Sequence, residues 1–405
     1  MFSVLTRNRD FAKLFAVQLV LFGGDWFVLI PLLTLLPDLT GRGLWGGLIL
    51  AADMLVLALS LPYAGTLADR VNRRTIMLST SAVSLGCVLL LLLVRSAGTV
   101  WIALVAVSIL AAAKAFFTPA AGAALPNVVD AVDLPAANAL AGSAWGTMLV
   151  LGASLGGIVG ARFGPYPCFV VTAGCMALAL VLTAGIRRPL QADRDEAAPA
   201  RPLRAVGEAL RYIGHRPRVA ALVTVKSAVG LGNGVLVVFP MLAAGMGPIG
   251  TGLLFAARGF GALIGPLLFR RVLAHRDWLL PGLAISMGLY GAAYLAVSVS
   301  PWFGLSLVLV VIAHVAGGGN WTMSNFALQE EVPDALLGRV LATDMMIATL
   351  AIAASQLVVG LFVDSVPVPV MFASCGAVTL VYSIIWRLWT WRQTRRPSPA
   401  EVVSS

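Results

Sequence analysis

Residues 65–74 read GTLADRVNRR and form a short charged stretch between two apolar runs, residues 44–66 and 75–95. The stretch holds four charged residues, although only 11% of the 405 residues are charged, far below the roughly 25% of soluble domains. Similar apolar runs, near the roughly 20 residues that span a bilayer as a helix, recur along the whole chain. A hydrophobic content of 59% and a mean hydropathy of +0.92 agree with this pattern. The sequence therefore predicts an all-α membrane protein.

Twelve transmembrane spans are predicted, numbered 1 to 12 along the chain: 12–36, 44–66, 75–95, 99–123, 137–160, 165–186, 218–243, 248–270, 278–299, 302–327, 339–363 and 367–388. An even number of spans places both termini on one side. Of the 28 lysines and arginines, those in loops on the opposite side are Arg42, Arg95 and Arg162. The excess of positive charge predicts cytoplasmic termini for this multi-pass protein of a cell inner membrane. Because the net charge of +10 is spread over short loops, we expect no nucleic-acid partner.

A charged, proline-containing segment divides the chain into two sets of six spans. The predicted parts are an N-terminal six-helix bundle at 1–186, a cytoplasmic linker at 187–217, a C-terminal six-helix bundle at 218–388 and a cytoplasmic tail at 389–405. A short amphipathic helix is expected near 203–213. The halves are similar at an offset of about 203 residues, so that Gly157 corresponds to Gly360. Such a parallel duplication is typical of transporters whose site lies between the two halves.

The charged stretch, placed between the second and third of twelve spans, resembles the G-x-L-x-D-R-x-x-R-R signature of the major facilitator superfamily. The matching residues are Gly65, Leu67, Asp69, Arg70, Arg73 and Arg74. The resemblance implies two six-helix bundles, alternating access, a working monomer and no cofactor. It also implies that Asp69 and its arginines brace a cytoplasmic gate against span 11. Asp344, near the start of that span, is expected to partner the loop of Asp69 or Arg70.

Two further stretches, LPAANAL (134–140) and LQEEVPDALLGRV (328–340), are similar to twelve-span bacterial exporters of drugs and siderophores. Span 5 of those exporters carries G-x-x-x-G-P-x-x-G-G. Here the matching glycines are Gly152, Gly156 and Gly157, whereas Met148 and Ala153 replace the first glycine and the proline. The incomplete motif leaves the direction of transport open.

Six ionisable residues lie within the predicted spans, three acids and three bases. They are Asp25, Asp53, Asp344, Lys114, Lys226 and Arg258. A charge at the bilayer centre costs about 2.5–3.5 kcal/mol on insertion scales, so this balance predicts pairing in a shared interior. The family fold implies a central cavity lined by spans 1, 4, 7 and 10. The predicted cavity residues are Gln18, Trp26, Lys114, Phe117, Lys226, Asn233, Arg258, His314, Trp321, Asn325 and Phe326.

Asp25 and Asp53 are the candidate proton-coupling residues. A carboxylate near the middle of span 1 can take up a proton from one side and release it to the other. The alternative is that Asp25 forms a fixed ion pair with Lys114 or Arg258. Arg258 itself could anchor an anionic substrate or hold one of the acids.

The sequence predicts a proton-coupled exporter of small amphipathic organic compounds, drugs or secondary metabolites, whose partners are a small-molecule substrate, protons and the bilayer. Aromatic rings beside a few polar groups suit such substrates. An importer or a lipid flippase on the same fold is the alternative, because basic cavity residues also suit an anionic headgroup. A membrane enzyme or scaffold is not expected, since no catalytic constellation is visible. Three histidines in all predict no metal site.

Overall fold

The computed structural model describes residues 3–68, 70–130, 132–191, 202–269 and 276–391, and the regular structure within them is helical. The N-terminal helices are α1 (Ser3–Arg7), α2 (Arg9–Thr40), α3 (Leu44–Ala68), α4 (Arg73–Leu91), η1 (Ala97–Thr99), α5 (Val100–Val128), α6 (Leu134–Phe163) and α7 (Pro165–Ala184). They are followed by α8 (Pro202–Gly214), α9 (Pro217–Gly232), η2 (Asn233–Val238), α10 (Phe239–Leu242), η3 (Ala244–Met246), α11 (Gly247–Leu268), η4 (Arg276–Trp278), α13 (Leu279–Val297), α14 (Phe303–Glu331), α15 (Asp334–Phe362) and α16 (Val368–Thr390).

Twelve helical segments of the described chain are long and apolar enough to cross a bilayer, which confirms the predicted number. A helix satisfies its backbone hydrogen bonds internally, as an apolar segment in lipid must. Eleven spans are nearly continuous helices, whereas the seventh combines α9, η2 and α10. The predicted amphipathic helix near 203–213 is also present, as α8.

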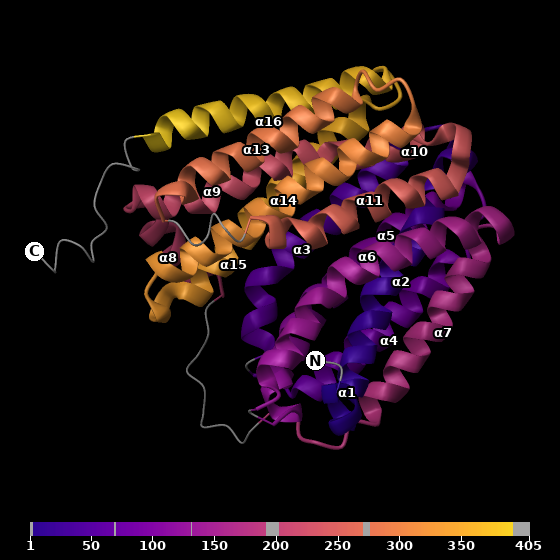
Figure 1. The fold of residues 1–405 in the computed structure, drawn as a ribbon. Helices are drawn as coiled ribbons and strands as arrows, with labels where there is room; N and C mark the ends of the chain where they lie inside the picture. Colours follow the sequence, from indigo (N-terminus) through magenta and orange to yellow (C-terminus); the bar gives the residue numbers. More distant parts are fainter. Residues whose placement is uncertain (1–2, 69, 131, 192–201, 270–275, 392–405) are drawn as a thin grey trace, which may run out of the picture.

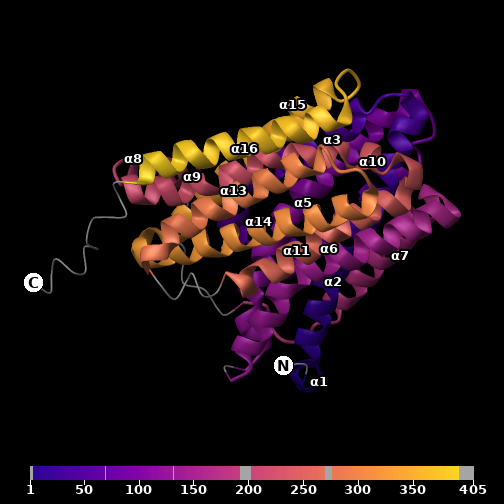
Figure 2. The same ribbon diagram turned by 45° about the horizontal axis from the view of Figure 1, so that its top comes forward.

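The spans form two bundles, α2–α7 and α9–α16, which confirms the predicted fold class (Figure 1). Two hydrophobic clusters contain only residues before α8, one contains only α8 and later residues, and one joins both bundles. We call the end where α2 begins and α16 ends the terminal side, and the end where α2 meets α3 the distal side. Figures 1 and 2 show the two bundles diverging toward the terminal side.

Glycines allow the two bundles to approach closely where α3 packs on α15 and α6 packs on α11. A Cβ atom on Gly47 would lie 2.5 Å from the Cα of Gly360, and one on Gly157 would lie 3.2 Å from the Cα of Gly252. Such small residues let membrane helices pack backbone against backbone. Gly252 follows Gly47 by 205 positions and Gly360 follows Gly157 by 203, so the duplicated halves use equivalent glycines.

Asp364 adds a polar contact between the bundles on the distal side. Its carboxylate accepts hydrogen bonds from the backbone N–H groups of Gly43, at 2.7 Å, and Leu44, at 3.3 Å. These groups lie at the start of α3, where unpaired N–H groups and the helix dipole favour an anion. The α15–α16 loop is thereby fastened to the first bundle.

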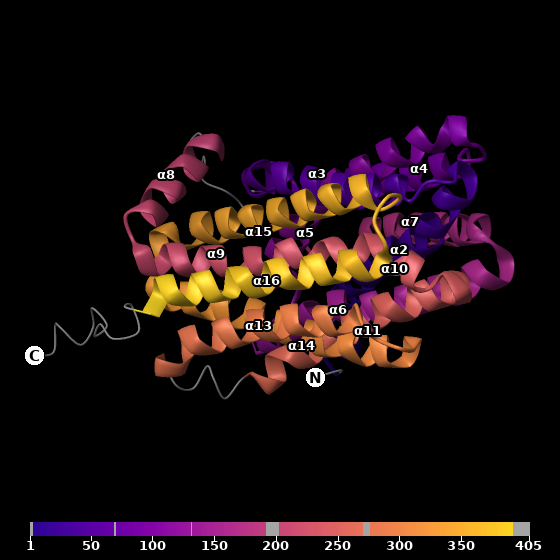
Figure 3. The ribbon, with the colours of Figure 1, turned by 90° about the horizontal axis from the view of Figure 1, so that it is seen from above.

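The seventh span loses regular α-helical geometry at Asn233, where α9 passes into η2. Ser355 of α15 compensates for the disrupted helix: its hydroxyl accepts from the N–H of Gly234, at 2.9 Å, and donates to the carbonyl of Leu231. An interrupted membrane helix is tolerated where a neighbouring helix supplies such partners. Figure 3 shows α8 inclined to the spans at the end where α9 begins; its Ala209 and Ile213 pack in the core of the second bundle, and its Glu208 accepts from Arg339 of α15 at 2.8 Å.

We predict that Gly47→Ala shifts the protein toward a conformation with the distal side open. The added methyl group meets the backbone of Gly360, and overpacking of this kind costs about 1–3 kcal/mol. Separation of the bundles removes the clash, so the equilibrium should shift by roughly 5- to 150-fold. Spin labels at Trp101→Cys and Val299→Cys, exposed positions of the two bundles, report the distance between the distal ends.

Gly46→Ala is the matched control, because a Cβ atom at Gly46 makes only an ordinary contact with Leu33, at 3.5 Å. The control should keep the wild-type distance distribution. The same distribution in Gly47→Ala would contradict the assignment of Gly47 to a closed contact between the bundles.

Candidate functional site

A cluster of three charged side chains lies inside the first bundle, near the middle of its helices. Lys114 of α5 donates to Asp25 of α2, at 2.6 Å, and to Asp53 of α3, at 3.3 Å. Lys114 and Asp25 keep 27% and 23% of their side-chain surface exposed, whereas Asp53 keeps 12%. One ammonium group therefore serves two carboxylates, and the cluster is one negative charge in excess when all three groups are ionised.

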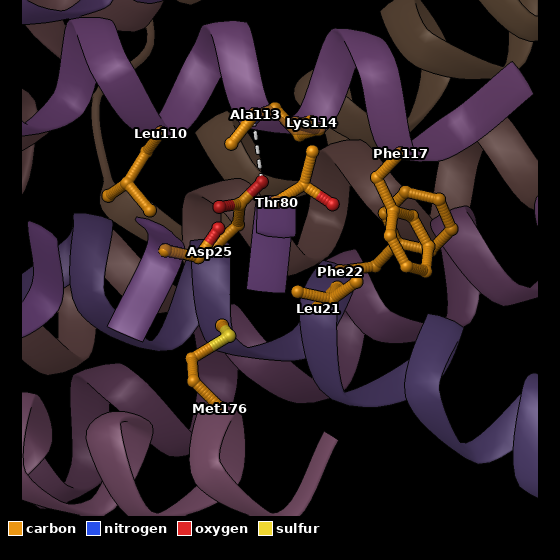
Figure 4. A pocket seen from close by; sticks show the side chains of 10 residues that line it. Leu21, Phe22, Asp25, Thr80, Leu110, Ala113, Lys114, Phe117 and Met176 are labelled. Carbon is orange, nitrogen blue, oxygen red and sulfur yellow. Dashed lines mark hydrogen bonds and ion pairs between the residues drawn. The ribbon is translucent and has the colours of Figure 1, made fainter. Parts of the chain in front are cut away.

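A small pocket opens beside the Asp25–Lys114 ion pair (Figure 4). Its walls come from α2, α4, α5 and α7 and include Phe117, one turn after Lys114, and Met176. Thr80 and Ser84 of α4 also line the pocket. The pocket gives this cluster an apolar lining with a few polar groups.

A second ion pair is buried inside the other bundle. Lys226 of α9 contacts the Asp344 carboxylate and donates to the side-chain oxygen of Asn325, at 2.6 Å. The Trp321 ring lies under the same ammonium, 5.0 Å from the ring centroid. Only 1% of the Lys226 and Asp344 side chains is exposed. A pair sealed in this way has little access to water, unlike the cluster around Lys114.

This position corrects the expectation for Asp344, which we assigned to the gate loop of Asp69 or Arg70. Asp344 lies almost three turns inside α15, and Lys226 reaches it from the neighbouring helix. The sequence did not indicate which of the three bases would pair with it, because the angular position of each helix in the bundle is set by packing.

Arg258, near the middle of α11, has no carboxylate within 4 Å among the described residues. Its guanidinium instead lies over the rings of Trp26, at 5.4 Å, and Trp145, at 5.9 Å. Both tryptophans belong to the first bundle, so the contact crosses the interface between the bundles. Trp26 also packs on Phe255 of α11, with ring centroids 5.6 Å apart.

The remaining predicted cavity residues lie in separate surroundings. The Gln18 side-chain oxygen is buried without a hydrogen-bond partner in the described chain. Asn233 donates to the carbonyl of Val229 at 2.8 Å, and Nε2 of His314 lies 2.7 Å from the Tyr294 hydroxyl. Phe326 is 37% exposed. The eleven predicted residues therefore fall into several local groups.

The described part of the charged loop fastens helices of the first bundle to one another. Arg73 donates to the carbonyls of Ala123, at 2.7 Å, and Leu190, at 3.2 Å, and Arg74 donates to that of Ile186. Asn72 caps α4 by accepting from the N–H of Arg74. A cation near the last carbonyls of a helix is favourable.

The gate assignment stays a prediction. Asp69 lies outside the described residues. Gly65 ends the apolar part of α3, and a Cβ atom there would meet nothing within 4 Å.

Sequence reasoning missed Trp145, Tyr290 and Tyr294. The two tyrosines are four residues apart on α13, so they share one helix face, and their ring centroids lie 5.0 Å apart. That spacing was the available signal. Trp145 gave none, because an aromatic residue near the middle of an apolar span is equally suited to face lipid.

Twelve spans in two bundles, with charged groups held at mid-depth, define a membrane transporter. A family model, the Major Facilitator Superfamily, matches residues 15–280. The chain belongs to this superfamily, and it is a transporter and not an enzyme.

Individual relatives agree with this assignment. The MFS-type transporter YfiS of Bacillus subtilis is 23% identical over 94% of this chain and 93% of its own. The multidrug efflux pump Tap of Mycolicibacterium fortuitum is 26% identical over 82% and 83%. A solved POT family transporter, in complex with 5-aminolevulinic acid, has the same fold, with a TM-score of 0.78 at 13% identity over 96% of this chain and 97% of that one.

We predict that Asp344→Leu strongly destabilises the protein, whereas the double variant Lys226→Met and Asp344→Leu does not. The single change leaves a buried ammonium without its counter-charge, which costs about 3–5 kcal/mol. The double change replaces the pair by apolar groups and removes that cost. Thermal unfolding can be followed with a thiol-reactive dye, since Cys87, Cys168 and Cys375 are buried in the folded state.

The wild type and the double variant should have similar midpoint temperatures of unfolding, and both should unfold at a much higher temperature than Asp344→Leu. Equal midpoints for the single and double variants would contradict a sealed ion pair. Arg204→Leu, which breaks an exposed pair with Glu208, controls for loss of charge as such and should change the midpoint little.

Proposed function

We propose that the protein is a proton-coupled exporter of small amphipathic organic compounds that works by alternating access. The observation that carries the proposal is the Lys114 ammonium held between Asp25 and Asp53 at mid-depth beside a pocket. The relatives include a multidrug efflux pump, which supports export of organic compounds.

The charge balance of this cluster supports proton exchange. With Lys114 positive and both carboxylates ionised, one negative charge is uncompensated, and binding of one proton neutralises the cluster. Two interacting carboxylates take up that proton as a coupled pair, so the carrier is Asp25 with Asp53 and neither acid alone. The partial exposure of Asp25 and Lys114 supports access of protons to the pair.

The glycine contacts support a rocking motion of the two bundles. Gly47 with Gly360, and Gly157 with Gly252, hold the bundles against each other toward the distal side in this structure. Opening there, with closure of the terminal side, would move the site from one face of the membrane to the other.

The terminal side is the cytoplasmic face in this proposal, because it carries most of the lysines and arginines. The charged loop from Gly65 to Arg74, with Asp69 and Arg70, would form part of the gate at that face. The protein would work as a monomer in the inner membrane of a bacterium.

We predict that Asp25→Asn and Asp53→Asn each abolish transport driven by a proton gradient. Each change removes one of the two carboxylates, so the remaining pair with Lys114 is neutral and no longer requires a proton. The measurement is accumulation of ethidium, Nile red and 2-naphthoate in energised inverted vesicles, with uptake in uncoupler-treated vesicles as the zero level.

Asp38→Asn is the matched control, because Asp38 lies on the same helix, is exposed and stands outside the cluster. It should transport like the wild type. Wild-type transport by both Asp25→Asn and Asp53→Asn would contradict the assignment of these two residues as the proton carrier. Accumulation in right-side-out vesicles, with none in inverted vesicles, would show import and contradict export.

A further inference from the structure

Arg258 differs from the other intramembrane cations in what surrounds it. Lys114 has two carboxylates and Lys226 has one, whereas Arg258 has two indole rings and no acid within 4 Å in the described chain. The three intramembrane acids are already engaged by the two lysines. The equal numbers of acids and bases therefore do not produce three pairs, and one positive charge is left at mid-depth.

The second-bundle neighbours of Arg258 carry no negative charge either. The titratable groups that face Arg258 from the second bundle are Tyr290 and Tyr294 of α13 and His314 of α14. The Tyr294 hydroxyl is paired with His314 at 2.7 Å. Tyr290 is buried beside Tyr294, with ring centroids 5.0 Å apart.

The two tryptophans compensate only part of the cost of holding this charge. A cation over an aromatic face gains about 0.5–1 kcal/mol when exposed and about 2 kcal/mol when desolvated. Removing an ion from water costs several kcal/mol even after the protein relaxes. Arg258 is partly exposed in this structure, so water can supply the difference. Closing of the bundles would expel that water, and an anion would then be needed.

We infer that Arg258, Trp26 and Trp145 form a subsite for the acidic group of an amphipathic organic acid. This inference deepens the proposed function and rests on it, because it names the substrate class of that exporter. The planar guanidinium suits a carboxylate, which it can bind through two parallel hydrogen bonds. An aromatic or apolar body of the acid would lie against the indole rings.

The position of the subsite connects substrate binding to transport. Arg258 belongs to the second bundle and both tryptophans belong to the first, so one bound acid contacts both bundles at once. A bound anion removes the electrostatic cost of closing the bundles around Arg258. Without a bound anion, closing the bundles around Arg258 keeps this electrostatic cost. The empty transporter is therefore hindered from closing unless water still hydrates the guanidinium.

The test uses three probes with the same ring: 2-naphthoate, 2-naphthylmethanol and 2-naphthylmethylamine, which are negative, neutral and positive. Equilibrium dialysis against the purified protein measures their binding. Wild-type protein should bind naphthoate most tightly, and Arg258→Gln should weaken naphthoate by roughly 10- to 150-fold, the effect of losing a charge-assisted hydrogen-bonded contact. Binding of 2-naphthylmethanol should not change. Arg258→Lys keeps the charge but loses the planar fork, so its affinity for naphthoate should lie between those of the wild type and Arg258→Gln.

Trp145→Leu provides a second variant that leaves the arginine in place. It should weaken the binding of naphthoate. The control is Trp101→Leu, which changes an exposed tryptophan at the distal start of α5 and should leave naphthoate binding unchanged. Arg258→Gln should unfold at or above the wild-type temperature, because it removes a charge that has no counter-ion.

Equal naphthoate binding by wild type and Arg258→Gln, or preference for the amine, would overturn the inference. Displacement of naphthoate by short-chain phosphatidylglycerol at lower concentration would also overturn it, and would assign the anion to a lipid headgroup.

Transport measurements distinguish failure of this inference from failure of the proposed function. Proton-driven uptake of ethidium or Nile red without any naphthoate uptake leaves the exporter standing and removes the acid subsite. Arg258-dependent binding of naphthoate without transport of any probe would support the acid subsite and contradict the proposed exporter.

Discussion

A charged side chain inside a bilayer needs an opposite charge, an aromatic face or water, and each of the three intramembrane cations of this protein meets that need differently. Lys226 is sealed against Asp344, Lys114 is shared by Asp25 and Asp53, and Arg258 lies over two tryptophans. These environments set what each group can do. A buried complementary pair is a fixed part of the bundle, whereas a partly exposed cluster with one excess charge can exchange a proton.

The distribution of these groups agrees with the division of the chain into two bundles. The Lys114 cluster, our proposed site of proton exchange, lies inside the first bundle and the sealed pair inside the second, while Arg258 reaches across the interface. Equivalent glycines of the two halves bring the bundles into backbone contact at Gly47 with Gly360 and at Gly157 with Gly252. In the function that we propose, a proton in one bundle and a substrate between both bundles act on the same closing motion, because the free energy of closure depends on the charge of each site.

The amino-acid sequence was sufficient for the fold, because a dozen apolar runs and a repeated half leave few other arrangements of helices in a membrane. It also identified the six charged residues, since charges in apolar spans stand out. Their partners could not be deduced, because pairing depends on the angular position of each helix, which side-chain packing sets. Asp344 shows this: its place in the sequence suggested the gate loop, and its place on α15 directs it to Lys226. Trp145 carried no charge or motif, and only the structure relates it to Arg258.

Infrared difference spectroscopy of the purified protein during acidification can show whether the Lys114 cluster takes up a proton. The carbonyl band of a protonated carboxyl group is distinct from the carboxylate bands. We expect the wild type and the Lys226→Met, Asp344→Leu variant to gain the same carboxylic acid absorption on acidification. The gain should be smaller in the variant that combines Asp25→Asn and Asp53→Asn, whereas the exposed carboxyl groups of the chain titrate equally in every variant. Equal gains in this last variant and in the wild type, or a smaller gain without Asp344, would contradict the assignment of the exchangeable proton to the Lys114 cluster.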